Sequence, residues 1–268
     1  MNNDIPKTIP IKKIIVETPH VKTFVFQHHL GSKPGQFVNL WLPRLDEKPM
    51  SIAYDNGKEF WITMFAVGSF SKAMHKLKVG DPVGVRGPYG TNFSFKPKQR
   101  LAMMAGGYGA APLYYLTVQA VALGCFVDFV IGARGKEHLL YINRIKKLKN
   151  VNLHVATDDG SVGFKGYNTL ILEKLITDKD HVIDCVYGCG PEPMLKRISD
   201  ICYQNKVAAQ LSIERYMKCG FGVCGQCCVD PGGERMCKEG PVVNNILARK
   251  ITEFGKYHRD ALGKVHNF

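Results

Sequence analysis

The sequence contains no apolar run long enough to cross a membrane, no internal repeat and no low-complexity tract. A membrane-spanning helix needs about 20 consecutive apolar residues, so we expect no membrane contact. It also shows no secretory signal, and nine cysteines without such a signal indicate thiols kept reduced in the cytoplasm. We therefore expect these cysteines to be ligands or core residues and not disulfides.

Acidic residues are scarce as well: 23 Asp and Glu stand against 36 Lys and Arg, which gives a net charge of +13. Such a charge can bind nucleic acid, but here the basic residues are dispersed. The densest run, Arg144-Ile145-Lys146-Lys147-Leu148-Lys149, has helical spacing and is interpreted as a solvated helix face. We expect no nucleic-acid partner, although the charge would attract anionic cofactors.

The chain divides into three parts by pattern, and its 268 residues are enough for one large or two ordinary domains. Residues 1–97 alternate β-branched and aromatic segments with Gly, Pro and Asp-Asn-Gly turns, which predicts a small antiparallel β-barrel. The expected strands are residues 11–17, 21–27, 36–42, 59–66 and 82–86, with the fourth barrel segment entered at Lys48-Pro49-Met50-Ser51. One helix is expected over residues 69–77, where Phe70, Ala73, Met74 and Leu77 have helical spacing.

Residues 98–212 change to strand–helix alternation, which predicts a parallel sheet with right-handed crossovers, the architecture of a nucleotide-binding domain. Strands are expected at residues 101–105, 126–131, 151–157, 182–187 and 208–213. Helices are expected at residues 111–123, 139–148, 169–176 and 192–206. The remaining residues, 213–268, hold most of the cysteines and are predicted to form a small C-terminal subdomain.

Four of the cysteines, Cys219, Cys224, Cys227 and Cys237, have the spacing C-x4-C-x2-C-x9-C. The first three match the loop that holds a [2Fe–2S] cluster in plant-type ferredoxins. Gly220 and Gly222 let that loop approach the cluster closely, and its N–H groups can point at the sulfides. A zinc site, which also uses C-x2-C pairs, is the alternative. Cys228 is expected to be a small core residue.

Two motifs in the predicted barrel suit a flavin nucleotide. In Lys48-Pro49-Met50-Ser51 a cation and a hydroxyl lie close together, as a ribityl chain and pyrophosphate require, although an ordinary strand start has the same form. Gly68-Ser69-Phe70-Ser71 opens the barrel helix, where free N–H groups and hydroxyls can bind phosphate. A plain N-cap serine would explain the second motif equally well.

Two further loops follow strands of the predicted parallel sheet, at the edge where such sheets bind ligands. Gly106-Gly107-Tyr108-Gly109-Ala110-Ala111-Pro112 departs from the usual G-x-G-x-x-G pattern. Even so, Gly107 and Gly109 keep side chains away from a pyrophosphate at the helix N-terminus. In Gly188-Cys189-Gly190-Pro191 the Cys189 thiol would edge the cleft and could touch a nicotinamide, or could be structural.

These motifs form one ordered series that resembles the ferredoxin-NADP reductase superfamily. The series is K-P-M-S, G-x-x-S, Gly87-Pro88-Tyr89-Gly90, G-G-x-G-x-A-P-L, G-C-G-P and the C-terminal cysteine loop. Within that superfamily, a cluster placed after the nucleotide domain and followed by C-K-E-G-P-V resembles the electron-transfer subunits of NAD-dependent (type B) dihydroorotate dehydrogenases. Lys48 stands where the superfamily has arginine, which keeps the charge and loses the bidentate geometry.

The resemblance implies the cofactors FAD, a [2Fe–2S] cluster and NAD. It assigns FAD to Lys48, Pro49, Met50, Ser51, Thr63, Met64, Phe65, Phe70 and Ser71. It assigns the cluster to Cys219, Cys224, Cys227 and Cys237, and the pyridine nucleotide to Gly107, Gly109, Pro112 and Cys189. It also implies an FMN-containing catalytic subunit that oxidises dihydroorotate, in a heterotetramer of two plus two, with electrons passing through the cluster and FAD to NAD⁺ during pyrimidine synthesis.

The sequence offers no evident acid–base pair for substrate chemistry, which itself favours a partner subunit. Thr157-Asp158-Asp159-Gly160-Ser161 either contacts the ribose of the nucleotide or turns the chain. An acidic residue there favours NAD over NADP, while Arg134 and Lys136 weigh against that preference. The small subunits of electron-bifurcating ferredoxin:NADP oxidoreductases and hydrogenase-linked diaphorases share these motifs and remain alternatives, as does a basic zinc-binding nucleic-acid module.

Overall fold

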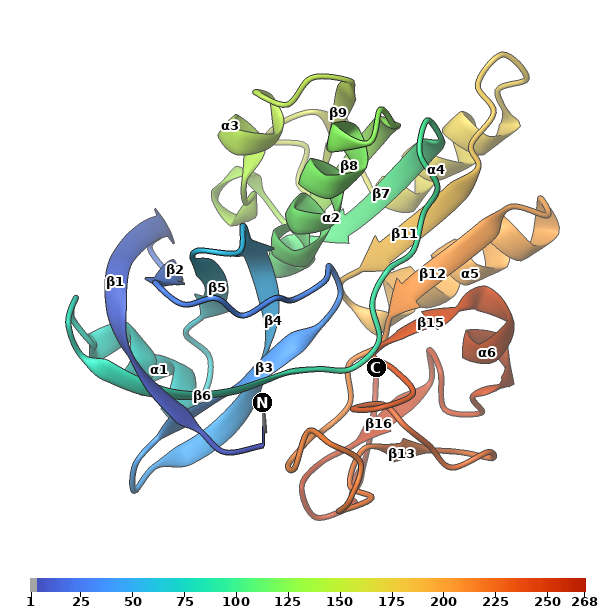
Figure 1. The fold of residues 1–268 in the computed structure, drawn as a ribbon. Helices are drawn as coiled ribbons and strands as arrows, with labels where there is room; N and C mark the ends of the chain where they lie inside the picture. The colour runs from blue at the N-terminus through green and yellow to red at the C-terminus, as the bar shows by residue number, and fades with distance from the viewer. Residues whose placement is uncertain (1–3) are drawn as a thin grey trace.

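The computed structural model describes residues 4–268, and its N-terminal part is a closed six-stranded antiparallel barrel (Figure 1). The barrel order is β1-β2-β5-β4-β3-β6. Its elements are β1 (Lys7–Thr18), β2 (Val21–Phe26), β3 (Phe37–Leu42), β4 (Asp46–Asp55), β5 (Phe60–Phe65), α1 (Ser69–Lys76) and β6 (Pro82–Tyr89). Along β5 every second side chain is buried, because alternate residues of a strand face opposite sides. Phe26 and Phe60 stack in the barrel core with their ring centroids 5.0 Å apart.

The second part is a seven-stranded sheet in the order β10-β9-β8-β7-β11-β12-β15. Its strands are β7 (Arg100–Gly106), β8 (Phe126–Ala133), β9 (Val151–Thr157), β10 (Phe164–Lys165), β11 (Cys185–Cys189), β12 (Ala208–Ser212) and β15 (Val242–Asn244). The first six run parallel, whereas β15 pairs antiparallel with β12. The strand at this edge therefore comes from the cysteine-rich C-terminal region.

Helices cover both faces of this sheet, and alternate residues of β7 face different cores. Leu101 and Met103 pack with helix α2 (Ala110–Ala122), whereas Ala102 and Met104 pack with residues of α4 (Asn168–Thr177) and α5 (Glu192–Gln204). Short elements complete the list: η1 (Gly107–Gly109), η2 (Lys136–His138), α3 (Ile142–Ile145), β13 (Cys228–Val229), β14 (Glu234–Arg235), α6 (Asn245–Lys250), β16 (Tyr257–Arg259) and β17 (Val265–Asn267). Within residues 4–268 we find no helix that is both long and apolar enough to pass through a bilayer.

The predicted fold class is confirmed: a barrel, a parallel nucleotide-binding sheet and a C-terminal cysteine region follow one another along the chain. Three local predictions were wrong. The helix expected over residues 139–148 is reduced to the four residues of α3, because Tyr141 takes a left-handed φ of 63° at its start. The strand expected over residues 182–187 is β11, which begins three residues later than expected, at Cys185, where it first pairs with β7.

The third wrong prediction concerns Cys228, which we expected in the core. It lies in β13 and is half-buried. The β13–β14 hairpin has only two residues in each strand, too few to cover both of its faces.

A buried ion cluster joins the start of α5 and the segment after β12 to the C-terminal region. Arg215, whose side chain is 3% exposed, contacts Glu192 at the start of α5 at 2.5 Å and Glu253 near the C-terminus at 2.7 Å. Glu253 also accepts from Arg259 at 2.5 Å. Since each buried charge has a partner of opposite sign, the desolvation cost of all three is offset.

We expect Arg215→Met to lower the free energy of unfolding by about 3–5 kcal/mol, because it leaves the buried Glu192 without a cation and removes one of the two cations that contact Glu253. Arg259→Met is the matched control, since Arg259 contacts the same Glu253 but its side chain is 32% exposed. Because Arg259 is partly exposed and Glu253 keeps its contact with Arg215 in this variant, we expect a smaller loss of about 1 kcal/mol. Chemical denaturation followed by circular dichroism measures both, and equal losses in the two variants would contradict this account.

Candidate functional site

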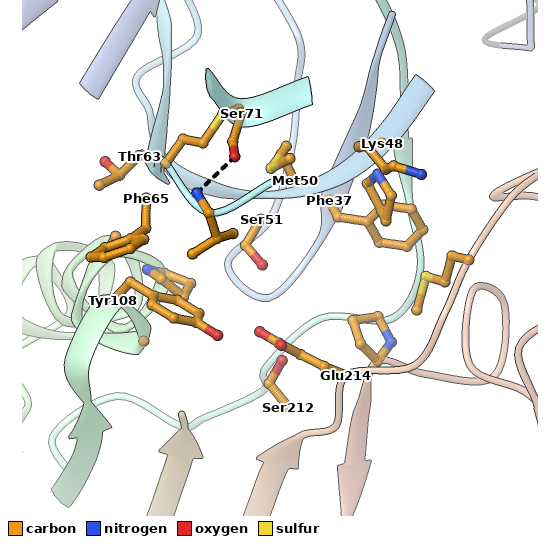
Figure 2. A pocket seen from close by; sticks show the side chains of 18 of the residues that line it. Phe37, Lys48, Met50, Ser51, Thr63, Phe65, Ser71, Tyr108, Ser212 and Glu214 are labelled. Atoms are coloured by element: carbon orange, nitrogen blue, oxygen red, sulfur yellow. Dashed lines mark hydrogen bonds between the residues drawn. The ribbon is translucent and has the colours of Figure 1, made fainter. Parts of the chain in front are cut away.

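A cavity of about 590 Å³ lies where the barrel, the sheet and the segment after β12 meet (Figure 2). Its size is that of pockets that hold much of a cofactor or drug-sized ligand. All the predicted cofactor residues except Gly107 line it: Lys48, Pro49, Met50, Ser51, Thr63, Met64, Phe65, Phe70, Ser71, Gly109, Pro112 and Cys189. The structure thus gathers residues of the barrel, 48–71, and residues of the sheet domain, 109–189, around one cavity.

The barrel residues contribute to this cavity in different ways. The Ser51 hydroxyl points into it (Figure 2). Lys48 borders it, with its Nζ 2.8 Å from Asp46 and 3.3 Å from the Tyr216 hydroxyl. Phe70 and Met64 line the cavity from the barrel core, in which both side chains are buried.

Thr63 and Ser71 use their hydroxyls within the protein. The Thr63 hydroxyl lies 2.6 Å from the Tyr141 hydroxyl and points away from the cavity (Figure 2). Ser71 Oγ accepts hydrogen bonds from the backbone N–H groups of Val67 and Gly68, at 2.9 and 3.0 Å. Ser71 therefore fixes the turn that leads into α1, and that turn forms part of the cavity wall.

A second cavity of about 910 Å³ lies at the carboxyl edge of the parallel sheet, where doubly wound folds bind nucleotides. Gly107 and Asp158 line it, together with Arg134 and Arg197. Asp159 instead accepts a hydrogen bond from the Ser161 N–H at 2.8 Å, which lowers the pKa of its carboxyl. The sequence analysis left two interpretations of this loop, a nucleotide contact or a turn. Asp158 lines the cavity, as the first requires, and Asp159 stabilises the turn, as the second requires.

Three residues, Phe65, Val67 and Tyr108, line both cavities. Beside them the two glycine loops of the sheet meet in close contact. A Cβ on Gly109 would lie 2.2 Å from the Cys189 carbonyl oxygen, so this contact requires glycine. Burial, followed by the nearby Glu214 carboxylate, raises the pKa of the Cys189 thiol to about 12. Cys189 therefore lines the first cavity as a buried thiol.

The cysteine loop has the backbone that an anionic iron–sulfur group requires. Gly220 and Gly222 have φ of +87° and +88°, and a Cβ on Gly220 would lie 2.9 Å from the Tyr89 ring. Burial works against ionisation of the Cys219 thiol, but the N–H groups of Cys224, Val223 and Phe221 point at its sulfur and lower its pKa to about 6. Amides directed at a thiolate stabilise negative charge there.

The four thiols are arranged as two pairs. Cys219 interacts with Cys224, and the Cys237 N–H donates to Cys227 Sγ at 3.4 Å. Across the residues that the structure describes, no three His, Cys, Asp or Glu side chains are arranged to hold a single metal ion. A [2Fe–2S] cluster has two irons and four cysteine ligands, two on each iron, whereas structural zinc draws four ligands to one point. The paired thiols fit the cluster better than zinc.

The cysteine loop lies against the barrel next to the first cavity. Asn39 of β3 donates to the Lys218 carbonyl oxygen at 3.1 Å, and the Tyr89 ring of β6 lies 6.3 Å from the Phe221 ring. Met217, two residues before Cys219, lines the first cavity. The cluster loop and the cavity therefore share one short segment of chain.

Glu214 and Tyr108 are among the residues of the first cavity to which the sequence analysis assigned no role. Glu214 follows β12 closely, and its position after the carboxyl end of a parallel strand was the available signal. Tyr108 lies within the glycine motif, and the sequence analysis interpreted only the flanking Gly107 and Gly109. Figure 2 shows the Tyr108 hydroxyl directed toward the Glu214 carboxylate, with Ser212 alongside.

The fold and the two cavities define a class of protein: a flavin- and pyridine-nucleotide-dependent oxidoreductase with the ferredoxin-NADP reductase architecture and an added iron–sulfur segment. The solved NADH-dependent reduced ferredoxin-NADP oxidoreductase superposes with a TM-score of 0.80 at 26% identity, covering 91% of this chain and 89% of that one. The cytochrome b5 reductase domain of Ulva prolifera nitrate reductase shares the fold, with a TM-score of 0.61 over 76% of this chain and 93% of that one at 21% identity.

Two family models and several curated relatives identify the family within this class. Residues 214–245 match the iron-sulfur cluster binding domain of dihydroorotate dehydrogenase B, and residues 103–200 match the oxidoreductase NAD-binding domain. Probable dihydroorotate dehydrogenase B (NAD⁺) electron transfer subunits from Methanocaldococcus jannaschii and Methanothermobacter thermautotrophicus are 46% and 42% identical, each match covering 97% of both chains. The chain belongs to the family of electron-transfer subunits of dihydroorotate dehydrogenase B.

We expect Cys224→Ser to lose most of the bound iron and sulfide, because it removes one of the four predicted cluster ligands. Cys228→Ser is the matched control, as Cys228 is a half-buried neighbour in the same loop outside the C-x4-C-x2-C-x9-C pattern. Iron analysis and the visible absorption of the purified variants test this. Full iron content in Cys224→Ser, or its loss in Cys228→Ser, would show that the ligand set is wrong.

Proposed function

We propose that this chain carries electrons from the FMN-containing catalytic subunit of a dihydroorotate dehydrogenase through a [2Fe–2S] cluster and FAD to NAD⁺, in pyrimidine synthesis. The observation that supports this most strongly is the continuity of residues 214–219. Met217 and Glu214 line the flavin-sized cavity, and Cys219 begins the cysteine loop. A flavin exchanges single electrons with a cluster and a hydride with a nicotinamide, so it belongs between them.

The first cavity is our proposed FAD site. Ser51 would donate its hydroxyl to the flavin, and Lys48 would supply a positive charge for the phosphates. Asp46, 2.8 Å from Lys48, holds that ammonium group in position. Ser71 would act indirectly, by shaping the turn over residues 67–68.

The second cavity is our proposed NAD site. Gly107 leaves its floor open, with φ of +52° and no atom within 4 Å of a Cβ built there. Asp158 lines the cavity and would accept hydrogen bonds from a ribose, and its charge would repel a 2′-phosphate. Because Phe65, Val67 and Tyr108 border both cavities, a nicotinamide and a flavin bound there would face each other across these side chains.

The cluster loop is our proposed electron entry point. Cys219, Cys224, Cys227 and Cys237 would ligate the cluster, and Cys224 and Val223 lie exposed on the surface. We place the catalytic subunit against this loop in a cytoplasmic heterotetramer of two plus two. A second candidate function is that of a small subunit of an NAD(P)H–ferredoxin oxidoreductase, favoured by the superposition with that enzyme.

We expect Ser51→Ala to weaken FAD binding about 5- to 10-fold, the value of roughly one hydrogen bond. Ser71→Ala should weaken FAD binding and also lower the melting temperature, because two N–H groups lose their acceptor. Fluorescence titration of the flavin-free variants, with parallel thermal melts, separates the two effects. Unchanged affinity in Ser51→Ala would remove this hydroxyl from the FAD site.

Co-purification tests the function itself. A tagged chain expressed in its native host should recover an FMN-containing subunit, and dihydroorotate should bleach the flavin absorbance of the complex before NAD⁺ is added. Adding NAD⁺ should restore that absorbance and form NADH. Recovery of a ferredoxin-reducing partner, with no bleaching by dihydroorotate, would favour the second candidate.

A further inference from the structure

The segment that leads from β12 into the cysteine loop has no regular secondary structure to hold it in place. Residues 213–217 belong to no helix or strand. Within residues 4–268, no backbone N–H group donates to the carbonyl oxygen of Lys218 or of Cys219. Because Cys219 is a predicted cluster ligand, the distance between the cluster and the first cavity depends on contacts made by side chains.

Asn39 of β3 supplies such a contact to both carbonyl groups. Its Nδ2 donates to the Lys218 oxygen at 3.1 Å and to the Cys219 oxygen at 3.4 Å. The Asn39 side chain is fully buried, and its Oδ1 meets no hydrogen-bond donor among the described residues. A buried amide oxygen without a partner costs stability. The favourable contacts of this amide therefore lie on its donor side, toward the cysteine loop.

Strand β3 joins this contact to the wall of the first cavity. Alternate residues of a strand share a face, and Phe37, two residues before Asn39, lines the cavity (Figure 2). Two residues of a strand span about 7 Å. One rigid piece of the barrel thus contacts the flavin-sized cavity at Phe37 and the cysteine loop at Asn39.

The cysteine loop fits closely against this part of the barrel. A Cβ on Gly220 would lie 2.9 Å from the Tyr89 ring and 3.2 Å from Asn39 Nδ2. Arg86, the residue opposite Asn39 on β6, lies over the Phe221 ring, with its Cζ 5.5 Å from the ring centroid. The loop therefore meets the barrel with its backbone, and that backbone contact is made through Asn39.

Resting on the proposed function, we propose that Asn39 is the positioning residue of electron transfer between flavin and cluster. Its amide holds the backbone of a cluster ligand against the strand that borders the flavin cavity, and so fixes the separation of the two cofactors. In this step the reduced flavin gives one electron to the cluster, where one ferric ion becomes ferrous, and no bond forms between the two centres. The rate of such a transfer falls steeply with distance, so it depends on the Asn39 contact.

The hydride step provides an internal reference. NADH gives the flavin a hydride, which is two electrons and one proton, and this step does not involve the cluster. Asn39 lines neither cavity. A change at Asn39 should therefore slow the passage of electrons from flavin to cluster and leave the reduction of the flavin by NADH at the parent rate.

The first variant is Asn39→Leu, which keeps the size of the side chain and removes both amide donors. The oxidised holoprotein is mixed with NADH, and flavin bleaching is followed by stopped-flow absorbance and cluster reduction by freeze-quench EPR. Bleaching should keep the parent rate. The EPR signal should appear about 10-fold more slowly, the value of roughly one hydrogen bond. Rates are expressed per intact cluster, counted from the EPR signal of the fully reduced protein.

Asn245→Leu is the matched control. The Asn245 amide is also buried and also donates to a backbone carbonyl at 3.1 Å, that of Ser199, while its oxygen accepts from the Ser199 hydroxyl at 2.6 Å. Asn245 lines neither cavity. Because both ends of its amide are bonded, Asn245→Leu should lower the melting temperature more than Asn39→Leu does. It should leave the rate of cluster reduction unchanged.

Asn39→Asp separates hydrogen-bond donation from shape. It keeps the shape of the side chain, but a carboxylate would repel the two carbonyl oxygens, so cluster reduction should slow at least as much as in Asn39→Leu. Two readouts do not depend on turnover. In both Asn39 variants, backbone amides of residues 218–224 should exchange with deuterium faster, and the g-values of the reduced cluster should shift. Asn245→Leu should match the parent in both measurements.

The outcomes separate this proposal from the proposed function. Cluster reduction at the parent rate in Asn39→Leu or Asn39→Asp would overturn the role of the amide. Equal slowing of both steps would also overturn it, since Asn39 would then act on the flavin itself. If NADH does not bleach the flavin of the parent protein, the proposed function fails. Photoreduction of the flavin then supplies the electron, and the same comparison of variants still tests Asn39.

Discussion

The Arg215 guanidinium and its two buried carboxylates hold the working parts of the molecule together. Glu192 begins α5 directly after the Gly188-Cys189-Gly190-Pro191 loop, and Glu253 belongs to the C-terminal region. A buried arginine is tolerated only when its charge is met, so the three elements must stay in register. The same constraint acts on the preceding residue: since Arg215 is engaged with Glu192 and Glu253, Glu214 faces the cavity without an ion-pair partner among the described residues. One electrostatic requirement thus sets the geometry of the site.

The site is built where three structural units meet, and each supplies what the others lack. The barrel contributes hydroxyls and a paired lysine, the parallel sheet contributes glycine turns at its carboxyl edge, and the C-terminal region contributes thiols within an amide-lined loop. Three residues, Phe65, Val67 and Tyr108, border both cavities. Side chains can rearrange when ligands enter, whereas the glycine contact between Gly109 and Cys189 cannot.

Much of this could be predicted from the sequence because its signals are local. Alternating apolar residues indicated the barrel strands, glycine turns after strands indicated the nucleotide edge, and cysteine spacing indicated the cluster. β4 was indicated only by its Lys48-Pro49-Met50-Ser51 entry, because a charged, proline-containing stretch becomes a strand through its pairing with β3 and β5. The environment of Glu214 could not be predicted, since it depends on the contacts of the adjacent Arg215 with Glu192 and Glu253, which lie 23 and 38 residues from it in the sequence. Ser71 shows the converse: its hydroxyl motif was visible, but its acceptor role toward Val67 and Gly68 was not.

The antiparallel strand β15 makes the iron-binding tail part of the sheet and not a separate attachment. It hydrogen-bonds to β12, the last of the parallel strands, through Gln210, Leu211 and Ser212. Without β15, β12 would be an exposed edge strand with unpaired backbone N–H and C=O groups, and such edges promote aggregation. Removing the tail would therefore uncover an edge of the sheet as well as take away the cysteine loop.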